Sequence, residues 1–218
     1  MTPQPRIVIV GAGGHAASVA EAARAGGSDV CGYVDTSSAQ LPVLDAPVYR
    51  SLSEAGPLRA DRVVVAVGDN YQREQLWGEI KATQPDLVAG TVIHPRAVVA
   101  SNAIIEEGSV ILAGAVVGSR ASISTFAIIN SGAIIDHDCH LGDFSSVGPG
   151  ATLGGRVHVG RGSAVAIGAV VREGCSIGEN SVLGAGSYLH GNLASDVVAY
   201  GSPAQVQNSR NPGDPYLR

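Results

Sequence analysis

An aliphatic side chain returns at every sixth position through the second half of this sequence. The series begins at Ile93, ends at Leu189 and is never interrupted. The residue four positions after each member is Ala, Ser or Cys, except at Val157 and Leu193. Neither a helix, with its period of 3.6, nor a strand, with its period of two, produces this spacing. A repeat of six is typical of a β-helix, in which three hexads, or 18 residues, complete one coil.

The composition suits a narrow solenoid better than a broad globular core. Aromatic residues are only 4% of the 218 residues while hydrophobic residues reach 45%, so small and branched aliphatic side chains must fill the core. Charged residues are 15%, below the usual quarter, which predicts surface buried against other subunits. The net charge of −5 argues against nucleic acid or an anionic membrane as the main partner. The first residues resemble neither a signal peptide nor a membrane span, so we expect a cytoplasmic protein.

The three cysteines have no metal-ligand spacing, and no metal site is expected. Cys139 and Cys175 occupy the small inward position of hexads two coils apart, which separates their thiols by about 10 Å and excludes a disulfide. The inward position also argues against Cys139 as a covalent nucleophile.

Residues 6–92 follow a different pattern, in which buried strands alternate with helices. Apolar runs at 6–10, 30–35 and 61–68 predict parallel strands, and helical segments follow the first and the third. The chain is therefore expected to begin with a small Rossmann-like α/β domain over residues 1–90. A left-handed parallel β-helix is expected over residues 91–206, and residues 207–218 are expected to form a loosely ordered tail.

A glycine-rich turn after the first strand indicates a nucleotide site. Gly11, Gly13 and Ala16 match the pattern GxGxxA, and Asp35 follows about 20 residues on, at the end of the second strand. A second turn, 68–70, ends the third strand at the same edge of the predicted sheet. Half of a Rossmann domain is enough for a nucleoside diphosphate but not for NAD, so an NAD-dependent enzyme ranks last. A tight turn without a ligand is the remaining alternative.

His137 is the strongest candidate for an acid–base group in the predicted β-helix, because its hexad position lies on a corner and faces outward. Residues 18 apart stack on successive coils, so Asp138 is expected between Arg120 and Arg156 in a ladder of alternating charge. These neighbours should keep Asp138 ionised. An ionised carboxylate beside His137 would fix the imidazole tautomer and favour its protonated form.

Other polar side chains share the predicted corners. His140 and His158 stack at the last position of their hexads and are the main rivals of His137 for the role of base. Asn130 lies seven residues before His137, near the preceding corner.

With these residues, the chain resembles the hexapeptide-repeat acyltransferases, specifically the nucleotide-sugar N-acetyltransferases of the bacterial sialic-acid O-acetyltransferase-like group. The resemblance covers about residues 6–206 and is carried by four motifs in order: GAGGHA (11–16), GDN (68–70), INSGAIIDHDC (129–139) and GSPA (201–204). Members acetylate the 4-amino group of nucleotide-linked deoxysugars. The resemblance implies acetyl-CoA as co-substrate, no metal, and a homotrimer with active sites at subunit interfaces.

The resemblance also implies roles for individual residues. His137 would be the general base, with Asp138 at the neighbouring acid position and Asn130 as polar support near the sugar. The small domain would bind the nucleotide sugar through Gly13, His15, Asp35, Gly68, Asp69 and Asn70. Acetyl-CoA would lie along the β-helix between subunits, past Gly155, Ile167, Ala185, Gly201 and Pro203.

Two positions depart from the family pattern. Ser146 stands where some relatives carry a second active-site histidine, and Gln205 replaces the usual lysine after the GSPA turn. Arg210 is the candidate to replace that lysine in contacting a CoA phosphate. The nucleobase and the sugar stay open, and two other functions remain as alternatives: O-acetylation of sialic acid and non-catalytic binding of a nucleotide sugar by a trimer.

Overall fold

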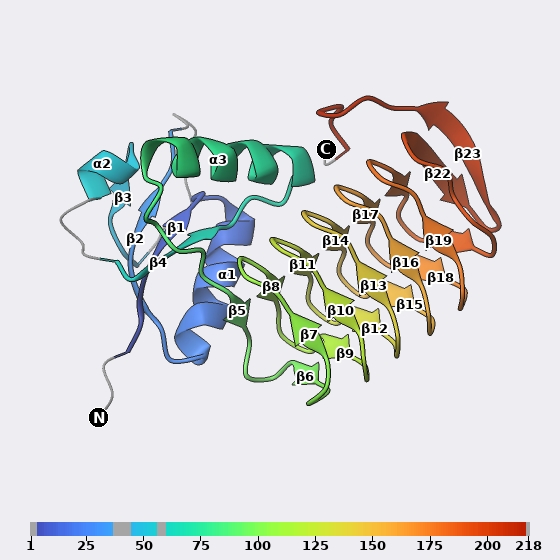
Figure 1. The fold of residues 1–218 in the computed structure, drawn as a ribbon, viewed down its shortest axis with the longest axis horizontal. Helices are drawn as coiled ribbons and strands as arrows, with labels where there is room; N and C mark the ends of the chain where they lie inside the picture. The colour runs from blue at the N-terminus through green and yellow to red at the C-terminus, as the bar shows by residue number, and fades with distance from the viewer. Residues whose placement is uncertain (1–3, 37–44, 56–59, 217–218) are drawn as a thin grey trace.

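The computed structural model describes residues 4–36, 45–55 and 60–216, and it has an α/β domain followed by a β-helix (Figure 1). The α/β domain holds a parallel four-stranded sheet in the order β3-β2-β1-β4. Its strands are β1 (Arg6–Val10), β2 (Asp29–Val34), β3 (Val48–Tyr49) and β4 (Arg62–Val65). Its helices are α1 (Gly14–Ala25), α2 (Leu52–Ala55) and α3 (Asn70–Thr83). The short edge strand β3 is an addition to the three strands predicted.

Helices cover both faces of this sheet, as the alternation of strands and helices predicts. Ile7 and Ile9 of β1 share a buried cluster with α1. Val8 and Val10 point to the opposite face, where they share a cluster with Ile80 of α3. This alternation follows from the two-residue period of a strand, and it makes β1 a central strand buried on both faces.

The hexads form the predicted parallel β-helix, with one two-residue strand per hexad. One sheet faces the α/β domain, and we call it the domain-facing sheet. It contains β5 (Val92–Ile93), β8 (Val110–Ile111), β11 (Ile128–Ile129), β14 (Ser146–Val147), β17 (Ala164–Val165), β20 (Val182–Leu183), β22 (Val197–Gly201) and β23 (Ala204–Ser209).

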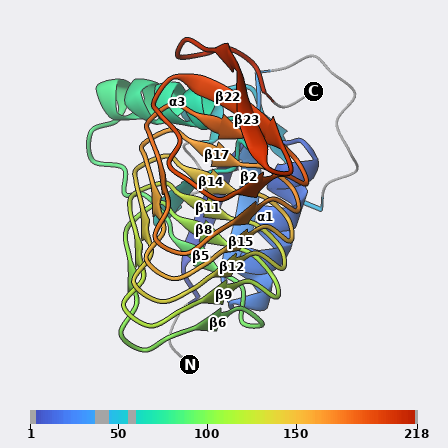
Figure 2. The same ribbon diagram turned by 90° about the vertical axis from the view of Figure 1, so that its right-hand side faces the viewer.

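Two further sheets complete the coil. The second sheet contains β6 (Val98–Val99), β9 (Val116–Val117), β12 (Ile134–Ile135), β15 (Thr152–Leu153), β18 (Val170–Val171) and β21 (Tyr188–Leu189). The third sheet contains β7 (Ile104–Ile105), β10 (Ser122–Ile123), β13 (His140–Leu141), β16 (His158–Val159) and β19 (Ser176–Ile177). Figure 2 shows the stacked coils from their C-terminal end.

The core of the β-helix consists of the two inward positions of each hexad. The large position supplies residues such as Ile123 and Leu141, and the small position supplies residues such as Cys139 and Cys175, all of them buried. Partners in adjacent coils differ by 18 residues, as in the pair Ser122 and His140. The cysteines are free thiols, and burial raises the pKa of Cys139, in agreement with its predicted inward position.

The C-terminal segment differs from the expected loosely ordered tail. β22 and β23 form an antiparallel hairpin that closes the last coil. The chain then returns over the coils toward α3 (Figure 1). There the hydroxyl of Tyr216 accepts a hydrogen bond of 3.2 Å from the backbone N–H of Asn70. Tyr216 thus ties the C-terminal segment to the α/β domain.

Two phenylalanines on successive coils form part of the contact between the domains. Phe126 and Phe144 stack with ring centres 5.0 Å apart, and Phe126 also lies 4.7 Å from the ring of Trp77 in α3. Both phenylalanines have left-handed backbone angles, φ 56° and 53°, at the corner position that glycine occupies in many coils. A bulky side chain is uncommon in this region, so the aromatic contact with α3 must offset local strain.

Arg73 is the second part of the contact and is completely buried. Its Nε donates to the carbonyl of Phe126 at 2.9 Å, and Nη2 donates to the carbonyl of Phe144 at 2.9 Å. Nη1 donates at 2.9 Å to the carbonyl of Val67, and Nη2 also donates to Oδ1 of Asn70 at 2.8 Å. Every nitrogen of the guanidinium group therefore has an oxygen partner, and those oxygens belong to both domains.

Candidate active site

A cavity of 1170 Å³ opens at the carboxyl ends of the strands in the α/β domain. This edge of a parallel sheet is where ligands bind in open α/β folds. Four of the six residues predicted to bind the nucleotide sugar line the cavity, namely Gly13, His15, Asp35 and Gly68.

The glycine turn between β1 and α1 has the geometry that a phosphate group needs. A Cβ atom added at Gly13 or Gly14 would meet no protein atom within 4 Å, so the backbone is open to a ligand there. Among the described residues, no side chain caps the start of α1. Asp35 accepts a hydrogen bond of 2.8 Å from the backbone N–H of Ala12, which fixes the turn against β2. A helix start with exposed backbone and no cap suits the phosphates of a nucleotide.

His15 lines the same cavity, and its Nε2 is buried without a hydrogen-bond partner in the described part of the chain. Burial lowers the pKa of His15 to about 4, and the positive charge of Arg73 contributes to this shift. The imidazole is therefore neutral at pH 7. A neutral imidazole with an unpaired nitrogen suits a polar group of a bound substrate.

The lowered pKa of His15 predicts a loss of stability in acid. The unfolded chain, with a histidine pKa near 6.5, binds more protons than the folded chain between about pH 6.5 and 4. The free energy of unfolding should therefore fall as the pH falls through this range, with a contribution from His15 of up to about 3 kcal/mol. Denaturant unfolding of the wild type and of His15→Gln at several pH values measures it. The same pH dependence in both proteins would contradict the prediction.

The other two predicted residues, Asp69 and Asn70, are not among those that line the cavity. The carboxylate of Asp69 caps α3 by accepting from the N–H of Gln72 at 2.9 Å. The carboxamide of Asn70 is buried and donates to the carbonyls of Gly162 and Ser163 in the β-helix. The GDN turn thus contributes Gly68 to the cavity and uses Asn70 to hold the domains together.

Arg50 is a cavity residue that the sequence reasoning missed. It follows the short strand β3, and its Nη1 lies 3.5 Å from the carbonyl oxygen of Asp35 at the rim of the cavity. A guanidinium group at this position suits the negative charge of a diphosphate. The available signal was its place directly after a strand, but a two-residue edge strand gives a weak pattern.

His137 lies on the corner between the second and third sheets, and it faces outward as predicted, with 42% of its side chain exposed. Its Nδ1 lies 2.7 Å from Oδ2 of Asp138. Arg120 forms a two-pronged ion pair with Asp138, with N–O distances of 2.7 and 2.8 Å. The hydrogen bonds from Arg120, and then from His137, hold the pKa of Asp138 well below its usual range. The ionised carboxylate accepts from Nδ1, so Nε2 is the nitrogen that can take a proton.

The predicted charge ladder is only half correct. Asp138 pairs with Arg120 in the preceding coil, but Arg156 in the next coil pairs with Glu173, with an N–O distance of 3.5 Å. The backbone stacking is as expected, since the N–H of Arg156 donates to the carbonyl of His137. The long side chain of Arg156 takes the alternative carboxylate within its reach, because Asp138 is already paired with Arg120.

Gly155 forms the wall against which the imidazole of His137 packs. A Cβ atom added at Gly155 would lie 2.6 Å from both Cε1 and Nε2 of His137. Gly118, on the equivalent corner of the preceding coil, leaves room for the backbone instead, since a Cβ atom there would lie 2.8 Å from the backbone nitrogen of His137. Gly155 thus sets the position of the imidazole by leaving space for it, and Gly118 allows the backbone of His137 to stack closely on the preceding coil.

Gly155→Ala is therefore expected to displace the imidazole and lower kcat by about 10²-fold, because small misplacements of a reacting group have effects of this size. The backbone of Gly155 does not lie in the left-handed region, so alanine fits it without strain. Steady-state kinetics with saturating substrates measures the effect. Gly191→Ala is the matched control, since a Cβ atom there meets nothing within 4 Å. Equal kcat values for the two variants would contradict the proposed contact.

The remaining predicted residues lie on another corner of the β-helix. Asn130 follows β11, and Ile167 and Ala185 follow β17 and β20, so all three lie along one edge of the domain-facing sheet. Ile167 is 57% exposed, and Ala185 is also exposed. Gly201 and Pro203 form the turn of the β22–β23 hairpin above them. Within one chain, therefore, Gly155 is the one predicted acetyl-CoA residue close to His137. The other predicted acetyl-CoA residues, and Asn130 of the predicted sugar site, lie on a different corner.

The two positions that depart from the family pattern, Ser146 and Gln205, both lie in strands of the domain-facing sheet. Ser146 lies in β14 of the domain-facing sheet, next to the hydroxyl of Tyr216 and not on the corner of His137. Gln205 lies in β23, beside the GSPA turn. Arg210 comes at the opposite end of β23 and is only 6% exposed, so it does not replace the missing lysine at the GSPA turn.

The cavity and His137 lie on opposite sides of the same chain. The α/β domain packs on the outer side of the domain-facing sheet, where Val110 and Ile128 share a cluster with Ile7 and Ile9. His137 is on the corner between the other two sheets, across the β-helix from this contact. One chain alone thus does not bring His137 to the cavity of its own α/β domain.

Comparison with known proteins identifies both parts of the chain. Residues 6–80 match the family described as PglD N-terminal domain, and residues 156–191 match the bacterial transferase hexapeptide family of six repeats. The structure is similar to that of PerB from Caulobacter crescentus in complex with CoA and GDP-perosamine, with 36% identity, a TM-score of 0.85, and coverage of 95% of this chain and 99% of that one.

A second similar structure is the acetyltransferase domain of PglB from Neisseria gonorrhoeae in complex with acetyl coenzyme A. It has 32% identity, a TM-score of 0.86, and coverage of 94% of this chain and 100% of that one. WeeI from Acinetobacter baumannii shares the fold at 21% identity, with a TM-score of 0.74 and coverage of 94% and 100%. A search of the curated proteins found no match.

The described residues contain neither a cluster suited to a metal ion nor a helix suited to crossing a membrane. No group of three or more His, Cys, Asp or Glu side chains there is arranged to hold a metal ion. None of the helices in that part of the chain has the length and apolar character needed to cross a membrane.

Proposed function

Because the chain belongs to the family of hexapeptide-repeat nucleotide-sugar N-acetyltransferases, we propose that it transfers an acetyl group to the 4-amino group of a nucleotide-linked deoxysugar. The chain is an acetyl-CoA-dependent sugar N-acetyltransferase, with acetyl-CoA as its co-substrate. The observation that carries the proposal of acetyl transfer to a sugar amine is the His137–Asp138–Arg120 arrangement. In it, a histidine is oriented by an ionised carboxylate. The need for acetyl-CoA favours the cytoplasmic location expected from the sequence.

The proposed reaction is direct transfer. The amine nitrogen of the sugar attacks the thioester carbonyl, the new N–C bond forms, and the C–S bond breaks to release CoA as a thiol. Nε2 of His137 accepts the proton that the amine loses, and the resulting imidazolium is stabilised by Asp138. The imidazolium then gives this proton to the departing sulfur, so that CoA leaves as a thiol and His137 returns to its neutral form. Arg120 acts through Asp138, because its two hydrogen bonds hold the carboxylate beside Nδ1.

The proposed active site lies between two chains of a trimer. This arrangement is supported by the position of His137 across the β-helix from the cavity of its own domain. In an assembly of copies, the His137 corner of one chain can meet the Asn130 and Ile167 edge of the next. The predicted sugar and acetyl-CoA residues, which are split between two corners of one chain, would then face each other.

The outer face of the second sheet offers the surface for such an assembly. Its outward residues include Val98, Ile134 and Val170, which are 64%, 41% and 42% exposed. They lie in one row, because β6, β12 and β18 belong to the same sheet. A row of exposed aliphatic side chains on a regular sheet is typical of a subunit interface.

Ile134→Glu is expected to dissociate the trimer, because it places a charge in the centre of this row. Analytical ultracentrifugation should then give the mass of a monomer, and acetyl transfer should be lost. Val88→Glu is the control, since Val88 is similarly exposed, at 45%, but lies in the α/β domain. A trimeric Ile134→Glu protein would exclude this face as the interface.

The function is tested by offering acetyl-CoA together with GDP-, UDP- or TDP-linked 4-amino sugars and following thiol release. Mass spectrometry should find the acetylated sugar, and the preferred nucleotide identifies the base. Free sialic acid is the comparison substrate for the alternative O-acetylation. Turnover of sialic acid alone would refute the proposal, and nucleotide-sugar binding without turnover of any substrate would favour the non-catalytic alternative.

A further inference from the structure

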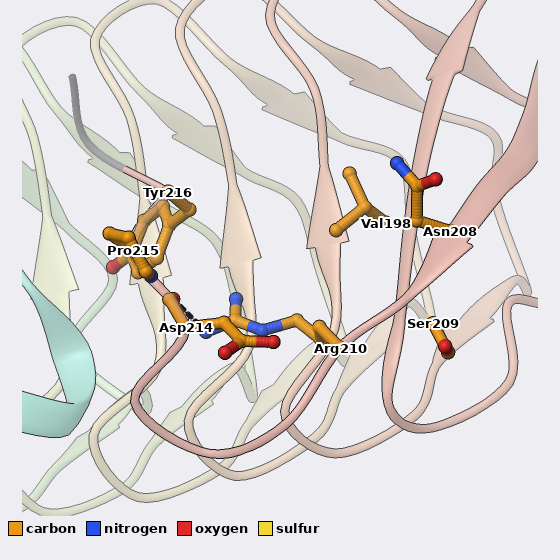
Figure 3. A pocket seen from close by; sticks show the side chains of 7 residues that line it. All are labelled: Val198, Asn208, Ser209, Arg210, Asp214, Pro215 and Tyr216. Carbon is orange, nitrogen blue, oxygen red and sulfur yellow. Dashed lines mark hydrogen bonds between the residues drawn. The ribbon is translucent and has the colours of Figure 1, made fainter.

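A second polar cavity lies under the C-terminal hairpin (Figure 3). It forms because the chain turns back after β23 and covers the outer side of the last coils. Its walls are supplied by Val198 from β22, by Asn208 and Ser209 from β23, and by Arg210, Asp214 and Tyr216 from the returning segment. This cavity shares no lining residue with the nucleotide cavity.

Arg210 is the buried charge of this cavity, with only 6% of the residue exposed. Its Nη2 donates to the backbone carbonyl of Asp214 at 2.8 Å, and its guanidinium carbon lies 5.2 Å from the centre of the Tyr216 ring. Its Nε and Nη1 are buried without a hydrogen-bond partner among the described residues. Arg210 also takes part in none of the ion pairs formed by those residues.

Arg73 shows what a purely structural buried arginine looks like in this protein. All three of its guanidinium nitrogens donate to oxygen atoms of the chain. Arg210 is buried to a similar degree, but only one of its three nitrogens has such a partner. A buried cation with unused donors is unfavourable unless an anion completes its contacts. Among the described residues, the carboxylate of Asp214 forms no ion pair with Arg210, and its Oδ2 accepts from the N–H of Asn211.

We propose that this cavity binds a phosphate group, with Arg210 as its central donor. The side chains of Asn208 and Ser209 line the cavity farther from the guanidinium group and add polar character to its wall (Figure 3). A phosphate offers more acceptor oxygens than a carboxylate, and arginine recognises it well. The phosphate belongs either to inorganic phosphate or to a phosphate monoester, and the experiment separates these sources.

The test uses the full-length protein and measures binding by calorimetry at constant ionic strength, with inorganic phosphate, glycerol phosphate and acetate as probes. Arg210→Gln is expected to weaken binding of the preferred phosphate by at least about tenfold, because a charge-assisted hydrogen bond is lost. Asn208→Asp keeps the guanidinium group but adds a negative charge to an exposed wall residue, so it should also weaken binding, by a smaller factor. Arg172→Gln, at an exposed arginine of the β-helix, should leave binding unchanged.

Preference for one of the two phosphate probes identifies the source and supports the site. Binding that survives both Arg210→Gln and Asn208→Asp would overturn the proposal, because the phosphate would then occupy another site such as the nucleotide cavity. Stronger binding of acetate, or no binding of either phosphate, would also overturn it. If Arg210→Gln does not fold, Asn208→Asp alone decides the result.

Discussion

Replacing His137 with alanine is expected to lower kcat by about 10²–10⁴-fold, the usual contribution of a general base. The fold should be retained, because 42% of the His137 side chain is exposed and its neighbours in the coil core do not depend on it. Kinetics at saturating acetyl-CoA and nucleotide sugar measures the loss. A thermal melt of the same preparation checks that the variant is folded.

His158→Ala is the matched control, since His158 is another exposed histidine of the β-helix, one coil further on. A His137→Ala protein with near wild-type kcat would exclude His137 as the general base. A loss of kcat in His158→Ala as large as that in His137→Ala would show that the effect is not specific to His137. Asp138→Asn should also lower kcat more than it lowers stability. Because the pKa of Asp138 is held well below its usual range, its carboxylate stays ionised over the pH range of such assays.

Arg73→Met is expected to have the largest effect on stability, a loss of about 3–5 kcal/mol in the free energy of unfolding. The guanidinium group is completely buried, and its removal leaves the carbonyls of Phe126 and Phe144 without their donors. Burial lowers the pKa of Arg73 to about 10, so the group is still charged at pH 7. Methionine fills much of the volume, which separates the polar loss from a cavity effect.

Denaturant unfolding at a fixed protein concentration measures the change, because assembly of subunits shifts the apparent stability. Arg172→Met is the control for loss of an arginine at an exposed position. A change below about 1 kcal/mol in Arg73→Met, comparable to a surface substitution, would show that the domains do not depend on this residue.

The hexads predicted the β-helix because its core repeats locally. Each inward position follows from the spacing alone, which is enough to predict that Cys139 points inward and His137 outward. The α/β domain was predictable for a similar reason, since a buried strand such as β1 is one continuous apolar run. The short strand β3 carries too few residues for such a pattern.

The contacts between the domains could not be predicted from the spacing. Asn70 belongs to the GDN turn after the third predicted strand, which suggested a nucleotide contact, yet its carboxamide bonds to the β-helix some 92 residues later. Phe126 and Phe144 occupy a corner position where the repeat favours glycine, and only the packing of Trp77 explains them. Such pairings depend on how two domains dock, which leaves no periodic signal in either one.

Register alone also does not decide which charges pair. Arg156 stacks one coil from Asp138 but reaches Glu173, because a long flexible side chain has several carboxylates within range. The position of Arg210 could not be predicted from the sequence for a related reason. It is only five residues from Gln205, but β23 carries it to the opposite end of the hairpin from the GSPA turn.

The placement of His137 and the nucleotide cavity on opposite sides of one chain has a genetic consequence. In the proposed trimer, each active site takes its base from one chain and its nucleotide cavity from another. A chain without His137 and a chain with a damaged cavity would each be inactive alone. When the two assemble together, some interfaces combine the intact half of each, so the two defective genes would complement one another within a single cell.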